Sequence, residues 1–368
     1  MIINKIKNLN YLLIFLLILL SFIGAAGLYS AADGSYSPWT SKHLFRFYFF
    51  LFIAIIISLM DLKFIYKYTY VFFILSLCLL LSIELFGVLG KGATRWIRMF
   101  GFNLQPSELI KVSIILALAK FYHEIKFQHI KKIIYLFFPF LFIFLPFLLV
   151  LMQPDLGTSI SILFLGIIIL FVAGVMFWKF VLGFIISILS VPILLNIIEP
   201  YQRNRIISFL NPESDPLGQG YQLIQSKIAL GSGGAYGKGF LQGTQSYLEF
   251  LPEKQTDFIF TLIGEEFGFI GTVFIVILFI ILITVCFYIS IKSNHIYGSI
   301  LSIGVASNLF IYVIMNVAMV SGLMPIVGIP LPLISYGGSA MLSIMLSMGL
   351  VLNVDLNYNI KKLNNAKY

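Results

Sequence analysis

Apolar residues gather into long runs that are separated by short polar stretches. A helix needs about 20 consecutive apolar residues to cross the hydrocarbon core of a bilayer. Runs of this length recur along the whole chain, which predicts an all-α integral membrane protein with about ten transmembrane helices. The expected spans are residues 11–30, 44–60, 69–88, 106–122, 133–151, 156–174, 178–198, 258–291, 299–321 and 333–354.

The composition agrees with this pattern, because 60% of the residues are hydrophobic, 11% are charged and the mean hydropathy is +1.01. We expect a single polytopic membrane domain over residues 1–368. Lys5 and Lys7 before the first run, and small residues after it, resemble a signal peptide. Because this run is long and others follow, we expect a retained span.

Cytoplasmic loops of membrane proteins carry an excess of Lys and Arg. With a cytoplasmic N-terminus, the inner side holds thirteen lysines and the short outer loops hold five cations. We therefore expect both termini in the cytoplasm and the long loop 199–256 outside. The formal net charge of +9 then reflects topology and contact with anionic lipids, and not a nucleic-acid footprint.

Two polar segments interrupt the hydrophobic pattern. The first, Gly87 to Ser107, mixes Gly, Trp and Arg, which suits a loop in the interfacial zone where Arg95 can meet phosphates. The second is the long outer loop. Its residues 220–230 have the apolar spacing of a short amphipathic helix, and a Gly-rich stretch follows at 231–239. That stretch does not have the residue spacing of a phosphate-binding P-loop.

Cysteine and histidine indicate no metal or disulfide. Cys78 and Cys286 lie inside apolar runs, where packing is their expected role. The four His are scattered over loops without the spacing of zinc ligands.

Ionisable residues within spans are costly and therefore suggest function. Glu108 and Lys111 are three residues apart on one helix face, either as a neutralised structural pair or with a role in ligand binding or conformational coupling. Asp155 begins the sixth span, where it either caps the helix or acts directly. Glu265 and Glu266 are expected roughly 12 Å deeper than Asp257 along a straight helix, and to pair internally.

Asp257 is the most informative residue, because it lies where the long polar loop meets an apolar helix. It either caps that helix together with Thr256 or acts chemically at the membrane boundary. A helix N-terminus lowers a carboxylate pKa and partial burial raises it, so both directions stay open for Asp257. Asn308 and Asn316 in the ninth span are expected to make interhelical hydrogen bonds.

Several motifs together resemble the SEDS family (shape, elongation, division, sporulation) of integral-membrane peptidoglycan polymerases. The resemblance covers nearly the whole chain, and its outer loop is more similar to the elongation members than to the division members. Gln255 is a departure, because His is frequent at that position. The motifs are Gly92–Ile97, Gln105–Lys111, Gln153–Thr158, Leu251–Phe260, Gly328–Pro332 and Ser335–Gly338, with Asp215–Tyr221, Gln225–Gly234 and Gly237–Gln245 in the outer loop.

The resemblance implies a bacterial inner-membrane enzyme that adds the disaccharide of lipid II to a glycan strand. It assigns Asp257 as the essential outer-loop aspartate and Glu108 with Lys111 as a pair that couples activation to the core. It also implies a partner, a class B penicillin-binding protein that crosslinks the strands and switches the polymerase on.

For such an inverting transfer, we expect Asp257 to be the base that removes the proton from the acceptor hydroxyl. Arg203, Arg205, Lys227 and Arg95 are candidates for binding the pyrophosphate, with a merely solvated cationic loop as the alternative. A divalent cation, Mg²⁺ or Mn²⁺, could assist, although no carboxylate cluster demands one. Two other classes stay open: a lipid II flippase that depends on the charges inside the membrane, and a scaffold that tolerates substitution of Asp257.

Overall fold

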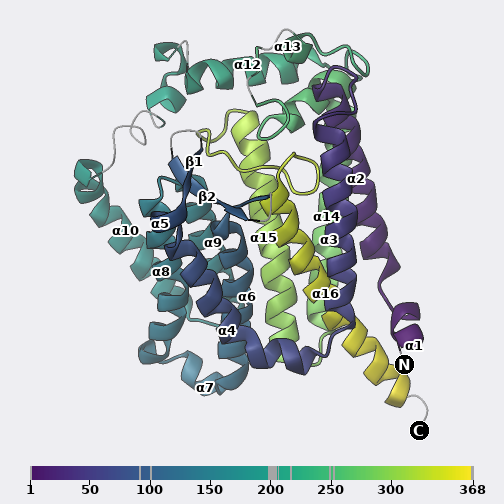
Figure 1. Cartoon of the computed structure of the whole chain (residues 1–368). Helices are drawn as coiled ribbons and strands as arrows, with labels where there is room; N and C mark the ends of the chain where they lie inside the picture. Colours follow the sequence, from purple (N-terminus) through teal and green to yellow (C-terminus); the bar gives the residue numbers. More distant parts are fainter. Residues whose placement is uncertain are drawn as a thin grey trace.

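The computed structural model describes residues 2–90, 93–99, 102–197, 205, 207–215, 218–247, 250–251 and 253–365. Long helices form one bundle, as Figure 1 shows, with the N- and C-termini at one end. The helices of the long loop lie across the opposite end. We call these the terminal end and the loop end of the bundle.

The first part of the chain contains the elements from α1 to α10. These are α1 (Ile2–Lys7), α2 (Tyr11–Ala31), α3 (Trp39–Leu59), α4 (Leu62–Leu81), α5 (Ile83–Phe86), α6 (Pro106–Glu124), α7 (Phe127–Ile130), the 3₁₀ turn η1 (Ile133–Leu136), α8 (Phe137–Met152), α9 (Leu156–Val172) and α10 (Phe177–Ile197). The second part adds the 3₁₀ turn η2 (Pro212–Ser214), α12 (Gln219–Ser232), α13 (Thr244–Tyr247), α14 (Ile259–Lys292), α15 (Ile296–Val320) and α16 (Gly338–Asn365).

Each predicted span overlaps one long helix, which confirms the all-α membrane class. Among the described residues, seven helical segments are long and apolar enough to cross a membrane, whereas α9 and the first part of α10 are apolar but shorter. The count of about ten spans therefore stays a prediction. The predicted amphipathic helix at 220–230 is confirmed as α12.

Some predicted boundaries were wrong. The last helix begins at Gly338 rather than at residue 333, because the chain before it is irregular and Leu333 has a positive φ of 63°. Helix α4, predicted as the span 69–88, begins seven residues earlier than expected, at Leu62. The Asp61 side chain caps it there by accepting a bond from Lys63 N (3.0 Å).

The polar segment 87–107, expected to be a loop, contains a small antiparallel sheet. Its strands are β1 (Val88–Gly90), β2 (Ala93–Met99) and β3 (Phe102–Leu104), in the order β1-β2-β3. Trp96 pairs with Val88 and Ile97 pairs with Leu104. Aromatic and β-branched residues at 94–97 favour this extended backbone.

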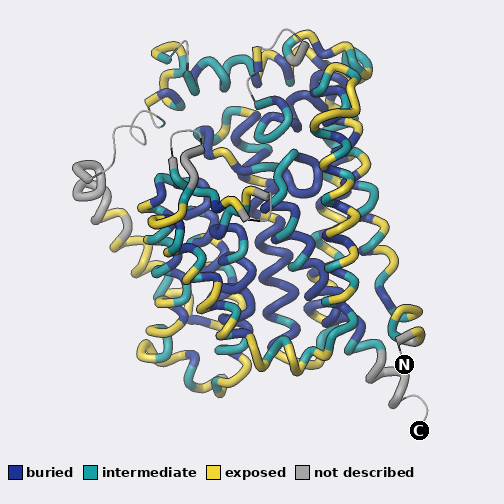
Figure 2. Tube along the Cα trace, viewed as in Figure 1, coloured by how far each residue is buried: buried dark blue, intermediate teal, exposed yellow. Residues whose placement is uncertain are grey.

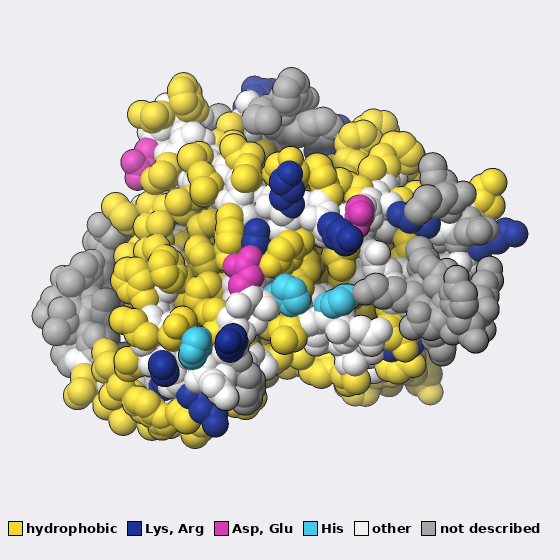
Figure 3. Space-filling view, turned by 90° about the horizontal axis from the view of Figure 1, so that it is seen from below, with side chains coloured by type: hydrophobic (Ala, Val, Ile, Leu, Met, Phe, Trp, Pro, Cys, Tyr) yellow, Lys and Arg dark blue, Asp and Glu magenta, His cyan; other side chains and the backbone are white. Residues whose placement is uncertain are grey.

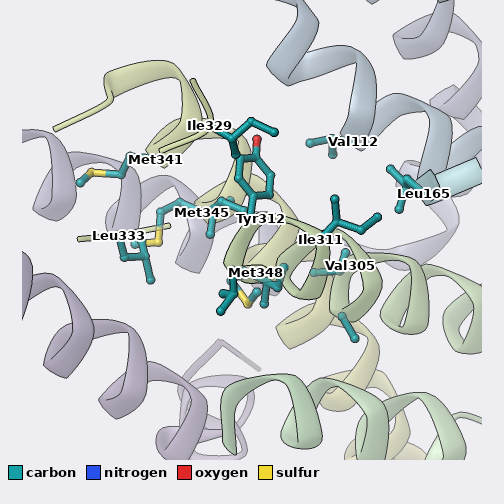
Figure 4. Close-up of a cluster of buried hydrophobic side chains, with 14 of the residues drawn as sticks. Val112, Leu165, Val305, Ile311, Tyr312, Ile329, Leu333, Met341, Met345 and Met348 are labelled. Carbon is teal, nitrogen blue, oxygen red and sulfur yellow. The ribbon is translucent and has the colours of Figure 1, made fainter. Parts of the chain in front are cut away.

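The core lies around α15 and α16, which are the most buried of the described segments that are long and apolar enough to cross a membrane (Figure 2). Methionines of α16 pack against α15, and Val112 of α6 and Leu165 of α9 belong to the same buried cluster (Figure 4). Most lipid-facing apolar residues lie on the surrounding helices. The bundle therefore places two central helices where their polar side chains are screened from lipid.

Helix α14 is two helices that meet at a sharp kink. Gly268, at φ 66° and ψ −163°, has a backbone conformation that is essentially restricted to glycine. A Cβ built at Gly264 would lie 3.2 Å from the Thr272 methyl, although eight residues span about 12 Å on a straight helix. The segment 259–267 therefore folds back against the rest of α14.

This reversal corrects the expected position of the two glutamates. Gly27 of α2 lies near Ile259 and Ile263, and Ser30, further toward the loop end, bonds Glu266. From residue 259 to residue 267 the chain therefore runs toward the loop end. Glu265 and Glu266 lie nearer that end than Asp257 does, and not deeper in the membrane.

Gly268→Ala tests the reversal. A Cβ there would lie 2.3 Å from Gly237 N, and the φ alone costs about 1–3 kcal/mol in any other residue. We expect a lower free energy of unfolding, measured by thermal unfolding in detergent. Gly183→Ala in α10 is the control, because its Cβ would meet nothing within 4 Å. Equal effects of the two substitutions would contradict the assigned reversal.

Candidate functional site

Asp257 lies at the inner end of the reversed helix, in a half-buried position at the loop end of the bundle. Its backbone carbonyl accepts a hydrogen bond from Asn316 Nδ2 (3.0 Å), which also donates to the carbonyl of Ile329 (2.8 Å). A Cβ built at Gly328 would lie 3.5 Å from Asp257 Oδ2, so the carboxylate lies against this glycine. Asn316 therefore bonds two non-helical segments, and an interhelical hydrogen bond of this residue stays a prediction.

The capping interpretation of Asp257 and Thr256 is wrong. The N-cap residue of α14 is Phe258, whose side chain makes no capping bond. Thr256 Oγ1 instead donates to Glu253 Oε2 (2.9 Å) within the loop. The carboxylate of Asp257 therefore does not serve as the N-cap of this helix.

Arg46 is a cation near this loop that the sequence identified only as a topological charge. Its guanidinium lies 4.9 Å from the ring centroid of Tyr336, and a Cβ at Gly338 would lie 3.3 Å from its Nη1. Tyr336 N in turn donates to the carbonyl of Gln255 (2.9 Å), two residues before Asp257. No spacing in the sequence could have joined α3 to these two segments.

The four predicted pyrophosphate-binding cations have different surroundings. Arg203 lies outside the described residues, and Arg205 is half-buried. Lys227 is exposed on α12, and a Cβ at Gly322, just after α15, would lie 3.0 Å from its Nζ. The bond between Ser226 Oγ and the carbonyl of Val320 (2.8 Å) holds α12 there.

Arg95, on β2, contacts Asp155 at the start of α9. Its Nη1 lies 3.8 Å from Asp155 Oδ1, and its guanidinium also donates to the carbonyls of Gln153 (3.3 Å) and Pro154. Asp155 accepts a bond from Thr158 N (3.4 Å), which confirms its capping role, and another from Gln105 Nε2 (2.9 Å). The Arg95 side chain is 22% exposed and is already bonded to these groups, so a role of Arg95 toward a substrate stays a prediction.

Glu108 and Lys111 form a buried ion pair with 2.8 Å between Lys111 Nζ and Glu108 Oε1. The hydroxyl of Tyr312, from α15, contacts both partners. Ser343 Oγ, from α16, donates to Glu108 Oε2 (3.1 Å). The pair therefore joins α6 to both central helices, and Tyr312 and Ser343 are members that sequence reasoning missed.

Asp215 organises the start of α12 in the outer loop. Its Oδ2 accepts bonds from Ser208 Oγ (3.0 Å) and Gly220 N (3.3 Å). Burial raises the pKa of Asp215, but these hydrogen bonds outweigh burial and hold the pKa below its usual value. The residue is therefore ionised at neutral pH and orders the turn before the helix.

Within the described ranges, no group of three or more His, Cys, Asp or Glu residues could hold a metal ion. The described residues therefore do not fit a metal held by the protein alone.

The FtsW/RodA/SpoVE family, described as cell cycle protein, matches residues 7–360, and the chain belongs to this family. The chain is 41% identical over 285 residues to the peptidoglycan glycosyltransferase MrdB of Escherichia coli K12. The matched region covers 76% of this chain and 75% of MrdB. It is 39% identical over 287 residues to the stage V sporulation protein E of Bacillus subtilis, covering 76% of each chain.

Solved structures have the same fold. A chain from a peptidoglycan synthase complex that coordinates polymerization and crosslinking has a TM-score of 0.82 at 30% identity, over 95% of this chain and 98% of that one. The rod shape determining protein RodA of Thermus thermophilus has a TM-score of 0.70 at 24% identity, over 94% of this chain and 96% of that one.

Single substitutions in the buried ion pair test its energetic role. Lys111→Met leaves the Glu108 charge buried without its counter-ion, which we expect to lower the free energy of unfolding by about 3–5 kcal/mol. Thermal unfolding of the purified protein measures it. Lys67→Met, at an exposed lysine of α4, should change it by less than about 0.5 kcal/mol. Combining Lys111→Met with Glu108→Gln should recover part of the loss; additive losses would contradict the pairing.

Proposed function

We propose that this chain is a peptidoglycan glycosyltransferase that polymerises lipid II during cell-wall elongation, with Asp257 as its general base. One observation carries the proposal. A half-buried carboxylate, one residue before the N-cap of the reversed helix, lies at the loop end of a bundle whose relatives are named peptidoglycan glycosyltransferases. There a lipid tail can stay in the bilayer while its head group reaches the carboxylate.

The loop end faces outward in this proposal, and both termini lie in the cytoplasm at the inner membrane. Figure 3, which views the terminal end, shows Lys and Arg side chains spread over that face. Such an excess of cations is typical of cytoplasmic surfaces. This orientation puts Asp257 on the side where lipid II is used.

The chemistry needs a base at the acceptor and positive charge at the leaving group. Asp257 takes the proton from the acceptor 4-hydroxyl while the oxygen of that hydroxyl forms a bond to the anomeric carbon. The bond from that carbon to the diphosphate breaks, and the lipid diphosphate leaves with inversion at carbon. A pyrophosphate leaves readily once its charge is neutralised, so one carboxylate with cations suffices, unlike the two carboxyl groups of most glycosidases.

The cations are part of the same proposal. Arg203, Arg205, Lys227 and Arg95 are the candidates for binding the diphosphate, and Arg46 beside Tyr336 joins them. A divalent cation, Mg²⁺ or Mn²⁺, would enter with the substrate diphosphate, since the described residues do not fit a metal held by side chains alone.

The partner in this proposal is a class B penicillin-binding protein that crosslinks the new strands. Similarity to a chain of a synthase complex that coordinates polymerization and crosslinking supports this partner. The buried Glu108–Lys111 pair, which joins three helices, would couple partner binding to the core.

One observation favours a second candidate, a lipid II flippase, because Glu108 and Lys111 are buried charges within the membrane bundle. A flippase depends on such charges and needs no outer base, so the two candidates differ in their need for Asp257.

Asp257→Asn is the decisive substitution. In the complex with the penicillin-binding partner and lipid II, we expect glycan polymerisation to fall at least about 10²-fold, because the base is lost. Gel analysis of glycan length measures it. Asp33→Asn is the matched control, since Asp33 is a half-exposed loop-end aspartate that pairs with Lys254 (3.3 Å).

Wild-type polymerisation by the folded, partner-bound Asp257→Asn variant would remove Asp257 from the chemistry. If the wild type made no glycan in an intact complex with active substrate, the flippase and scaffold interpretations would replace the polymerase.

Asn316 offers a test of how Asp257 is held. Asn316→Leu leaves two carbonyls without their donor, and we expect polymerisation to fall about 10-fold or more because the Asp257 backbone shifts. Asn308→Leu, on the same helix, is the control because neither polar atom of its buried side chain has a hydrogen-bond partner among the described residues. Similar rates for both variants would show that the Asn316 bonds do not position the base.

A further inference from the structure

The Gly-rich segment 233–245 contacts the far end of the reversed helix 259–267. Lys238 N donates to the carbonyl of Glu265 (3.0 Å), and Gly239 N donates to that of Glu266 (3.0 Å). Gly237 permits this approach, since a Cβ there would lie 2.1 Å from the Glu266 carbonyl oxygen. The two segments are therefore in direct backbone contact.

A side-chain cluster closes this contact, and the mechanism above does not use it. Glu265 is fully buried, and its Oε1 accepts bonds from Lys238 Nζ (2.7 Å), Thr244 Oγ1 (3.0 Å) and Gln245 N (3.0 Å). Lys238 Nζ also donates to Thr244 Oγ1 (2.7 Å). A buried carboxylate is costly in free energy unless it is paired, so Lys238 compensates the negative charge of the buried Glu265.

The cluster holds the far end of the short helix 259–267, which begins two residues after Asp257. The near end is held by Asn316, which bonds the Asp257 carbonyl, and the middle by Ser226 Oγ, which lies 2.9 Å from Thr261 Oγ1. A helix of two turns is stiff, so a displacement at Glu265 reaches Asp257. Misplacing a catalytic group by about 1 Å costs about 10²-fold in rate.

We propose that Glu265 and Lys238 are positioning residues for Asp257: their ion pair clasps the loop to the reversed helix and thereby sets where the base lies. The proposal rests on the proposed function. Lys238 is 27% exposed, and Thr244 Oγ1 and Gln245 N still donate to Glu265 when the lysine is replaced, so loss of the ion pair shifts the base without unfolding the bundle.

The kinetic test compares Lys238→Met and Glu265→Gln with wild type in the partner complex, at varied lipid II. We expect kcat to fall about 10- to 100-fold with KM changed less than threefold. The double variant should be no slower than the slower single variant, because both remove one interaction. Lys238→Arg, which keeps the charge, should restore most of the rate.

Lys292→Met is the matched control. Lys292 stacks on Tyr288 and Tyr358 at the terminal end, so its loss should leave kcat unchanged. Thermal unfolding and partner co-purification establish that every variant is folded. An unchanged kcat in the folded clasp variants, or independent additive losses, would overturn the proposal.

A second readout needs no enzymatic activity. With Cys78 and Cys286 changed to Ala, Asp257→Cys introduces a thiol whose labelling by a membrane-impermeant maleimide reports its position. Lys238→Met should change the labelling rate at least threefold, and Lys292→Met should not. An unchanged labelling rate overturns the proposed positioning role of Glu265 and Lys238, even if the wild type polymerises nothing. Failure of this proposal and failure of the proposed function are therefore distinguishable.

Discussion

The backbone reversal at Gly268 is the constraint on which the loop end depends. A single residue with φ 66° turns one apolar segment into two helices of opposite direction. The short helix then lies against α2, α12 and the Gly-rich part of the outer loop, as the contacts of Ile259 with Gly27, of Thr261 with Ser226 and of Glu265 with Lys238 show. Without this reversal Asp257 would lie at the outer tip of a straight helix. With it, the carboxylate lies half-buried against Gly328.

Buried charge is managed in the same way at two levels of the bundle. Glu108 near the centre and Glu265 near the loop end each have a lysine within 2.8 Å and additional hydroxyl donors. Lys111 lies on the same helix as Glu108, but Tyr312 and Ser343 come from distant helices, and the partners of Glu265 come from the outer loop. Each pair therefore fixes a packing arrangement as well as a charge, because breaking it leaves an uncompensated ion in a region of low dielectric.

Several site residues could be predicted because their signals are local. Asp257 follows a polar loop and precedes an apolar run, Asp155 precedes a helix, and Glu108 and Lys111 share a helix face. The predicted positions of Glu265 and Glu266 were wrong, because nothing in the sequence distinguishes Gly268, where the chain reverses, from Gly264 and Gly271 in the same apolar run. The sheet at 88–104 was missed because its strands are only three to seven residues long.

The amino-acid sequence alone predicts the helices, because a chain in lipid must satisfy its backbone hydrogen bonds internally and apolar runs of this length allow little else. Tertiary contacts establish which helix supplies each partner. Arg46 reaches Tyr336, Tyr312 reaches Glu108, and Asn316 reaches Asp257. Such pairs join segments far apart in the chain, and the energy that selects them comes from burying polar groups together, which no local pattern records.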